Sequence, residues 1–251
     1  MGKHSLLTIA GVLAVYLAIA PAVSAQDGNR ILAKVDSVMN APKDMVAIEK
    51  MTLIDANGSK KVRNTKIYQK GSEWRLVRFL SPADVRGVSF LRLASDRLYL
   101  YLPAFRRVRR IASSVKNENF MGTDFTYEDM SQSRYAPDYT ARLLSEKEGQ
   151  YVLELTPRPG ADVSYGKLVM YVDTSNYVFR RIEYYGRRGN LEKVLTVDNV
   201  RQINGYWIGA RMAMRNERDG HRTVMELSEV TFDQNLSDDV FSQRNLRRPE
   251  R

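Results

Sequence analysis

The sequence predicts a mainly β protein with a few helices, built on one large antiparallel sheet. From residue 45 onward apolar and polar residues largely alternate, which is typical of strands that bury one face. Turn-forming pairs such as Asn57-Gly58, Asn204-Gly205 and Asp219-Gly220 recur at intervals too short for intervening helices. Helical patterns are confined to residues 30–39, part of 113–148 and a terminal turn at 237–241. We therefore expect an antiparallel sheet of about eleven strands joined mostly by hairpins.

The first 25 residues are typical of a secretory signal peptide. Lys3 and His4 precede an apolar run over residues 6–20, and the small residues 23–25 form a cleavage site before Gln26. The run of about 15 residues is shorter than the roughly 20 that a membrane-spanning helix needs. We expect a signal peptide over 1–25 and a single exported, periplasmic domain over 26–251 without a transmembrane helix.

Composition narrows the possible chemistry and partners. The chain has no cysteine, which excludes a lipoprotein signal, disulfides and thiolate sites. It carries 39 basic and 29 acidic residues, a formal charge of +10. In an exported protein this surplus suits an anionic membrane surface or an acidic protein surface, and nucleic acid is not an expected partner.

The elements predicted along the chain leave a space to be filled. Residues 30–39 place Ile31, Val35 and Val38 at helical spacing, and alternating segments then occupy 45–111 and 151–232. The structure of residues 138–144 is not predicted. A twisted sheet of about eleven strands curls, splits or wraps around something. Two short helical elements would leave an apolar cavity inside it, although a filled β-sandwich has the same alternation.

Residues 120–130, Phe-Met-Gly-Thr-Asp-Phe-Thr-Tyr-Glu-Asp-Met, interrupt the strand pattern. Gly122 is a flexible point, and a Thr or Asp cap followed by two carboxylates supports a short helix from Thr123 onward. One interpretation is an apolar lid with an acidic rim over the cavity, and the other is a crossover that completes the core. The residues assigned to this lid are Gly122, Thr123, Asp124, Tyr127, Glu128 and Asp129.

Several of these features together resemble the outer-membrane lipoprotein-sorting proteins, relatives of the LolA and LolB lipoprotein carriers. They are the export signal, the N-terminal helix, the sequences at 74–76, 120–130 and 171–177, and the closing Ser-Asp-Asp-Val-Phe at 237–241. The resemblance covers essentially the whole mature chain. It implies an open, half β-barrel of about eleven antiparallel strands with a helical lid and an apolar cavity for acyl chains. It also implies an inner-membrane transporter and an outer-membrane acceptor as partners.

The candidate site is a binding cavity, because burial of methylene groups alone can hold an acyl chain. The residues assigned to the cavity are apolar: Ile48, Trp74, Leu76, Leu98, Leu100, Phe120, Phe125, Val169, Tyr171 and Ile182. The alternative for each single residue is ordinary core, so the hypothesis concerns the set.

No pattern in the sequence indicates catalysis, a metal or a cofactor. His221 is the one histidine after the signal and stands in a predicted hairpin turn, where a solvated position is expected. The sequence has no Gly-x-Ser-x-Gly turn, phosphate loop or paired metal-ligand spacing. The acidic residues of 124–129 are expected to cap and hydrogen-bond. We therefore expect a protein that is not an enzyme.

The densest basic run is Arg106, Arg107, Arg109 and Arg110. Four guanidinium groups in five residues could contact lipid phosphates or an acidic partner. A solvated edge strand protected by charge is the alternative. Arg187-Arg188 is a weaker candidate of the same kind.

Two functions follow from these expectations. The first is a periplasmic carrier that binds acyl chains of lipoproteins or lipids and moves them toward the outer membrane. The second is a non-transporting interaction module or accessory subunit of an inner-membrane exporter, with a cavity filled by its own helices or by a partner.

Overall fold

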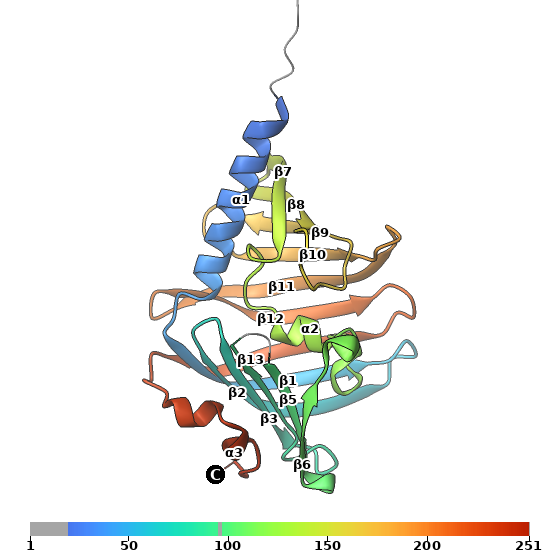
Figure 1. Cartoon of the computed structure of the whole chain (residues 1–251), viewed down its shortest axis with the longest axis vertical. Coiled ribbons are helices and arrows are strands. Elements are labelled where there is room, and N and C mark those ends of the chain that lie inside the picture. Colours follow the sequence, from blue (N-terminus) through green and yellow to red (C-terminus); the bar gives the residue numbers. More distant parts are fainter. Residues whose placement is uncertain (1–19, 95–96, 251) are drawn as a thin grey trace, which may run out of the picture.

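The computed structural model describes residues 20–94 and 97–250, and within them thirteen strands form one antiparallel sheet (Figure 1). The strand order is β6-β5-β4-β3-β2-β1-β13-β12-β11-β10-β9-β8-β7, and β6 and β7 are not paired with each other. The open antiparallel β fold that we predicted is confirmed. The strands are β1 Asp44–Ile54, β2 Lys60–Lys70, β3 Trp74–Ser81, β4 Ser89–Leu93, β5 Arg97–Leu102, β6 Arg107–Ile111, β7 Tyr139–Lys147, β8 Gln150–Pro157, β9 Lys167–Asp173, β10 Phe179–Tyr185, β11 Leu191–Ile203, β12 Tyr206–Asn216 and β13 Arg222–Phe232.

Short hairpins connect most neighbouring strands, as the turn signals predict. Gly58 and Gly205 adopt the positive φ values of 85° and 84° that a tight hairpin turn requires. The one long-range pairing joins the two halves of the chain, because β1 pairs with β13 and Met51 lies opposite Met225. The sheet therefore runs without a break from β6 to β7.

The N-terminal helix α1, Ala20–Met39, covers the open edge at β7. It begins ten residues before the predicted start at Arg30, and residues 1–19 of the predicted signal peptide lie outside the described part of the chain. The helix approaches closely at Gly28, where an added Cβ would lie 2.5 Å from the carbonyl oxygen of Ala141. Asn29 Oδ1 accepts a hydrogen bond from the Ala141 backbone N–H, at 2.9 Å. None of the helices in the described residues has the length and apolar character to cross a membrane.

The main hydrophobic core lies on the inward face of the sheet and is completed by the segment between β6 and β7. Phe120 is fully buried in this segment and contacts the rings of Phe90, Tyr127 and Phe79, with centroids 5.3, 5.6 and 5.9 Å away. The short helix α2, Tyr127–Ser131, follows it. Figure 1 shows α2 in front of the middle of the sheet.

A reciprocal capping box starts α2. The Asp129 backbone N–H donates to Thr126 Oγ1 at 3.1 Å, and the Thr126 backbone N–H donates to Asp129 Oδ2 at 2.7 Å. The predicted short helix is therefore present, but it starts after Thr126 rather than at Thr123. The residues before it, 120–122, form a 3₁₀ turn with Met121 and Gly122 at positive φ.

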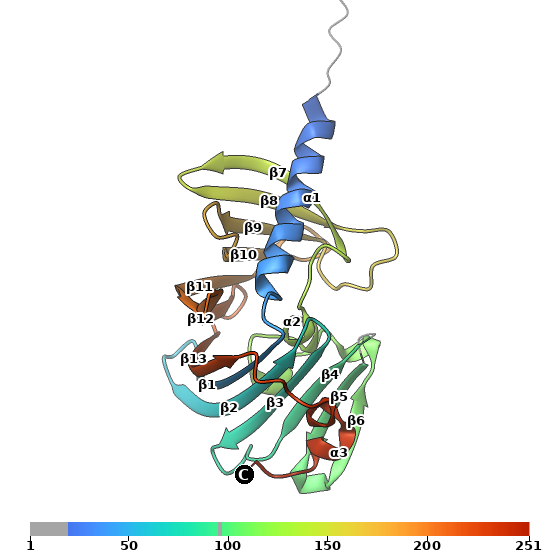
Figure 2. The ribbon, with the colours of Figure 1, turned by 90° about the vertical axis from the view of Figure 1, so that its left-hand side faces the viewer.

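A second apolar cluster lies on the outer face of the sheet. The C-terminal segment, with helix α3 Gln243–Leu246, folds back over β3 and β4 (Figure 2). Phe241 packs on Trp74 with ring centroids 5.7 Å apart, and Leu246 is buried with Leu76. Strand β3 is consequently apolar on both faces.

Candidate functional site

A cavity of about 210 Å³ opens on the inward face of the sheet, between the strands, the end of α1 and the segment around α2. Strands β1, β2, β3 and β10–β13 provide its wall, which includes Ile67, Val77, Phe179, Leu195 and Val197. An apolar cavity of about 150 Å³ in another protein stays dry and binds benzene. The space here is therefore large enough for part of one acyl chain.

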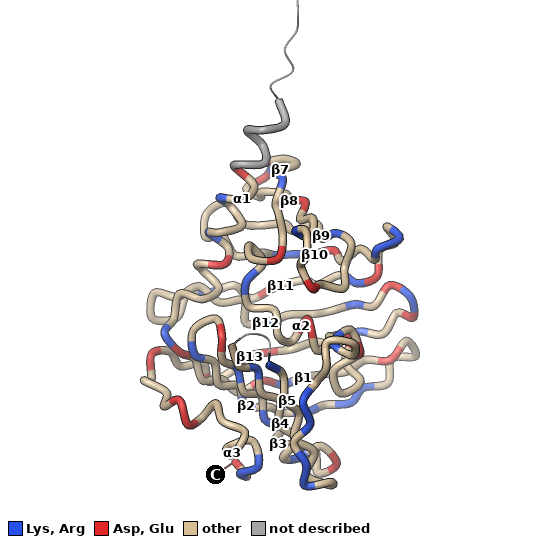
Figure 3. The backbone as a smooth tube through the Cα atoms, in the orientation of Figure 1, with Lys and Arg blue, Asp and Glu red and all other residues tan. Residues whose placement is uncertain are grey.

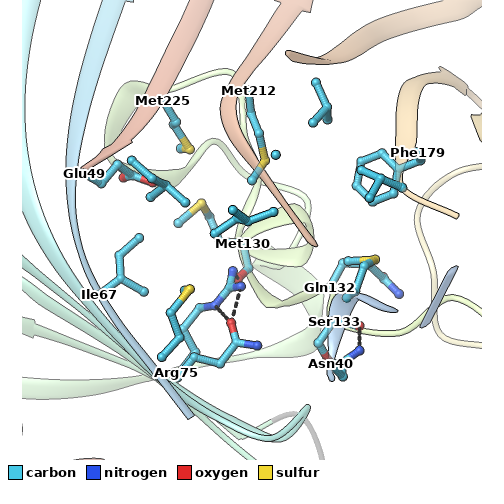
Figure 4. A pocket seen from close by; sticks show the side chains of 18 of the residues that line it. Asn40, Glu49, Ile67, Arg75, Met130, Gln132, Ser133, Phe179, Met212 and Met225 are labelled. Atoms are coloured by element: carbon cyan, nitrogen blue, oxygen red, sulfur yellow. Dashed lines mark hydrogen bonds between the residues drawn. The ribbon is translucent and has the colours of Figure 1, made fainter. Parts of the chain in front are cut away.

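Five methionines line the cavity, which makes its shape adaptable. Met130 comes from α2, Met212 from β12 and Met225 from β13, and Figure 4 shows these three around the same space. Met39 and Met45 line it at the junction of α1 and β1. Methionine is unbranched and polarisable, so it fits irregular or changing apolar ligands.

Four charged side chains line the cavity, Asp44, Glu49, Arg75 and Asp129, and the pKa values of Glu49 and Arg75 are strongly shifted. Glu49 is 4% exposed, and Thr65 donates a hydrogen bond from Oγ1 to Glu49 Oε1 at 3.1 Å. Burial raises the pKa of Glu49 to about 7, although the Thr65 hydrogen bond and the charge of Arg75 act against the rise. Burial, reinforced by the charge of Arg92, lowers the pKa of Arg75 to about 10. The cavity thus contains a carboxyl group that is half protonated near neutral pH and a desolvated guanidinium.

Polar contacts hold the segment that follows α2 against the end of α1. Asn40 Nδ2 donates to the Ser133 carbonyl oxygen at 2.8 Å. The carboxylate of Asp36 accepts hydrogen bonds from the backbone N–H groups of Tyr135 and Ala136, both at 2.8 Å. The pKa of Asp36 is raised, because burial outweighs these two hydrogen bonds. The cavity is closed on this side by contacts between main chain and side chain rather than by packing alone.

The carboxylates of the predicted lid each bond to the sheet or to the neighbouring loop. Asp129 accepts from Lys193 Nζ at 2.7 Å and from the Tyr165 hydroxyl at 2.9 Å. Glu128 accepts from the Ser164 backbone N–H at 3.0 Å, and burial raises its pKa. These groups fix the position of α2, and Asp129 also lines the cavity.

Asp124 forms a third such contact, with His221, for which the sequence predicted a solvated position. Asp124 Oδ2 lies 2.7 Å from His221 Nδ1, and Thr223 Oγ1 donates to the same oxygen at 2.7 Å. The other ring nitrogen of His221 lies 3.3 Å from Asp55 Oδ1. His221 is therefore held between two carboxylates and not freely solvated. Within the described residues no group of histidines and carboxylates could hold a metal ion.

The structure separates the ten predicted cavity residues into two sets. Leu98, Leu100, Phe120, Phe125 and Ile182 belong to the main core on the inward face, and of these only Phe125 lines the cavity. The other five lie on the outer face: Ile48, Trp74, Leu76, Val169 and Tyr171. Trp74 and Leu76 are covered there by the C-terminal segment. Among the predicted lid residues, Gly122 and Thr123 form the turn before α2, and Tyr127 packs on Phe120.

The basic run lies on the edge strand β6, where Figure 3 shows a line of basic residues. Arg107, Arg109 and Arg110 are exposed, and Arg106 precedes them at a positive φ of 51°. Arg109 lies over the exposed ring of Phe105, 6.0 Å from its centroid. Arg187 and Arg188 are on the β10–β11 hairpin, beside a separate polar pocket.

Sequence reasoning did not assign Glu49, Arg75 or any of the five methionines to the cavity. The alternation along β1 and β3 could have revealed the two charged residues. Glu49 shares the inward register of β1 with Ala47 and Met51, and Arg75 shares that of β3 with Val77. A charged residue in an otherwise apolar register marks a buried polar site.

Comparison with known proteins agrees with this architecture. A domain from Vibrio parahaemolyticus named for outer-membrane lipoprotein sorting is 32% identical, with a TM-score of 0.82 over 89% of this chain and 100% of that one. This chain belongs to the outer-membrane lipoprotein-sorting protein family. A model of an uncharacterized protein family matches residues 71–248. No curated protein matches the sequence.

Two further solved structures are similar to this chain. A DUF1329 family protein from Desulfovibrio piger is 28% identical, with a TM-score of 0.84 over 89% of this chain and 99% of that one. A LolA superfamily protein from Nitrosomonas europaea is 23% identical, with a TM-score of 0.73 over 89% of this chain and 100% of that one, and shows the shared fold. The lipoprotein-sorting fold suits a carrier-type protein.

Proposed function

We propose that this lipoprotein-sorting family member is a periplasmic carrier that binds an acyl chain of a lipoprotein or lipid in its inward-facing cavity. The observation that carries the proposal is the apolar, methionine-lined cavity between the curved sheet and the segment around α2. The proposed role is binding and transfer and needs no catalytic group. Export through a signal peptide over residues 1–25 is part of the proposal and rests on the sequence.

The energy for binding comes from burial of the chain. Each methylene group transferred from water contributes about 0.8 kcal/mol, so eight to ten buried groups supply roughly 6–8 kcal/mol before ordering costs. A cavity of about 210 Å³ takes only part of a long chain. A longer chain requires the methionine side chains to change rotamer or the segment around α2 to move outward.

In this role the protein would receive its cargo at the inner membrane and release it at an outer-membrane acceptor. The exposed arginines of β6 are proposed to contact anionic lipid headgroups or an acidic partner during these encounters. Such a contact is favoured at low ionic strength, because exposed charges are screened by salt.

Native mass spectrometry of the mature protein, isolated from a periplasm without detergent, tests the proposal. We expect a stoichiometric acyl-bearing species whose mass identifies the cargo. The variant Met212→Glu, which places a charge in the cavity wall, should lose this species while remaining folded by circular dichroism. Val62→Glu is the matched control, because Val62 is 45% exposed on neighbouring sheet surface outside the cavity.

The opposite result would favour an interaction module. Wild-type protein that is empty on isolation and also refuses added lipid would refute the carrier proposal. Equal cargo loading in Met212→Glu and wild type would show that the cavity is not the binding site.

A further inference from the structure

The guanidinium group of Arg75 lines the cavity and bonds to neutral acceptors. Arg75 donates from Nη2 and Nε to Gln69 Oε1, at 2.6 and 3.2 Å, and from Nη1 to the Met130 carbonyl oxygen at 3.4 Å. Both acceptors are neutral. Among the described residues Arg75 forms no ion pair with a carboxylate, and its side chain lines the cavity (Figure 4).

A desolvated cation of this kind is costly unless something compensates for its charge. Arg92 on β4 is the register partner of Arg75 and lowers its pKa, which increases this cost, and the charge of Glu49 offsets only part of it. An anion that entered the cavity would be attracted to Arg75.

The carboxyl groups of the cavity do not supply that anion. Asp44 accepts hydrogen bonds from the backbone N–H groups of Gln234 and Leu236, at 2.7 and 2.9 Å. Asp129 is paired with Lys193. Glu49 forms no ion pair with Arg75, and its charge raises the pKa of Arg75 by less than burial and Arg92 lower it. An anion that entered the cavity could therefore pair with Arg75 more closely than any of these carboxyl groups does.

We propose that the cavity selects a single-chain amphiphile with a carboxylate head group, of the fatty-acid class, whose carboxylate binds Arg75 and whose chain lies among the methionines. This inference rests on the proposed acyl-carrier function and specifies its ligand. The planar guanidinium matches a carboxylate with two parallel hydrogen bonds. The volume of about 210 Å³ suits one chain rather than the two chains of a phospholipid.

The orientation of the ligand follows from the same geometry. The carboxylate enters first and lies beside Gln69 and Arg75, and the chain points toward Met212 and Met225. A tail-first ligand, such as the acyl chain of an intact lipoprotein, would leave Arg75 uncompensated. The head group therefore distinguishes a free acid from a lipoprotein anchor.

The test compares dodecanoic acid with dodecanol, which has the same chain and no charge, by displacement of a neutral fluorescent probe at pH 7. We expect the acid to bind wild-type protein roughly ten- to a hundredfold more tightly than the alcohol, the usual range for a charge-assisted hydrogen-bonded pair. Arg75→Met should lose this preference while keeping its affinity for dodecanol. Arg63→Met is the matched control, since Arg63 is an arginine on the adjacent strand that does not line the cavity, and it should keep the preference.

Each outcome decides one of the two proposals. Equal affinity of wild type for acid and alcohol, or a preference for the acid that survives in Arg75→Met, overturns the inference and leaves the acyl-carrier function standing. If neither compound binds folded wild-type protein, the acyl-carrier function itself is refuted, and the inference with it.

Discussion

The buried carboxyl group of Glu49 makes a quantitative prediction about stability. Its pKa is about 7 in the folded protein against 4.5 for an ordinary glutamate. Between these pH values Glu49 keeps its proton in the folded protein and has lost it in the unfolded chain. The free energy of unfolding therefore falls as pH rises from 4.5 to 7, and above pH 7 the whole cost of ionising the buried carboxyl group is present. At 1.36 kcal/mol per pH unit, that cost is about 3 kcal/mol.

The substitution Glu49→Gln should remove this cost, because the amide is uncharged and its oxygen can still accept the hydrogen bond from Thr65. We expect the variant to be more stable than wild type by about 3 kcal/mol at pH 8, and nearly equal to it at pH 4.5. For a chain of this size the difference at pH 8 corresponds to a rise in Tm of roughly 6–12 °C.

Thermal and urea denaturation of both proteins from pH 4.5 to 8 measures this difference. Glu146→Gln, which removes an exposed carboxylate on β7, is the control and should show no such pH-dependent gain. A stability difference between Glu49→Gln and wild type that stays constant over this range would refute the reasoning, as would a variant that is less stable at pH 8. If the prediction holds, Glu49 is a residue that the protein keeps at a cost in stability.

Two other predictions concern the segment between β6 and β7 and the arginines of the edge strand β6. Phe120→Ala should lower the free energy of unfolding by about 3–5 kcal/mol, because it leaves a cavity among buried rings. Urea denaturation measures this free energy. A loss below about 1 kcal/mol would show that the segment is not part of the core. Replacing Arg106, Arg107, Arg109 and Arg110 with Gln should weaken cosedimentation with anionic vesicles at low salt and leave little difference from wild type at high salt, whereas unchanged binding at low salt would exclude this strand as the membrane contact.

Local sequence signals predicted most of the strands and hairpins and a short helix in the central segment, because each depends on near neighbours in the chain. The sheet has thirteen strands where about eleven were expected. Strand β7 was not predicted, since a bulge between Leu143 and Ser145 shifts the register and breaks the period of two. The exposed Leu144 at this point further obscures the pattern.

The sequence predicted a cavity but could not tell which residues would line it, because alternation does not say which face of a strand is inward. On β3 both faces are apolar, since the C-terminal segment buries Leu76 from outside while Val77 faces the core. That cover comes from residues more than 150 positions away, which no local pattern reports. Glu49 and Arg75 could have been found from the sequence, because both share one face of their strands with apolar residues. A charged residue among buried apolar positions indicates a polar function.

The unpaired edges of the sheet have a mechanical consequence. A closed barrel has its radius fixed by strand number and stagger, so it can widen only by breaking backbone hydrogen bonds. Here β6 and β7 are not hydrogen-bonded to each other, and the chain between them, residues 112–138, spans the gap. The sheet can therefore change its curvature at the gap between β6 and β7 while every strand pair stays intact. Residues 112–138, which fill part of the interior, also limit how far these two edge strands can move apart.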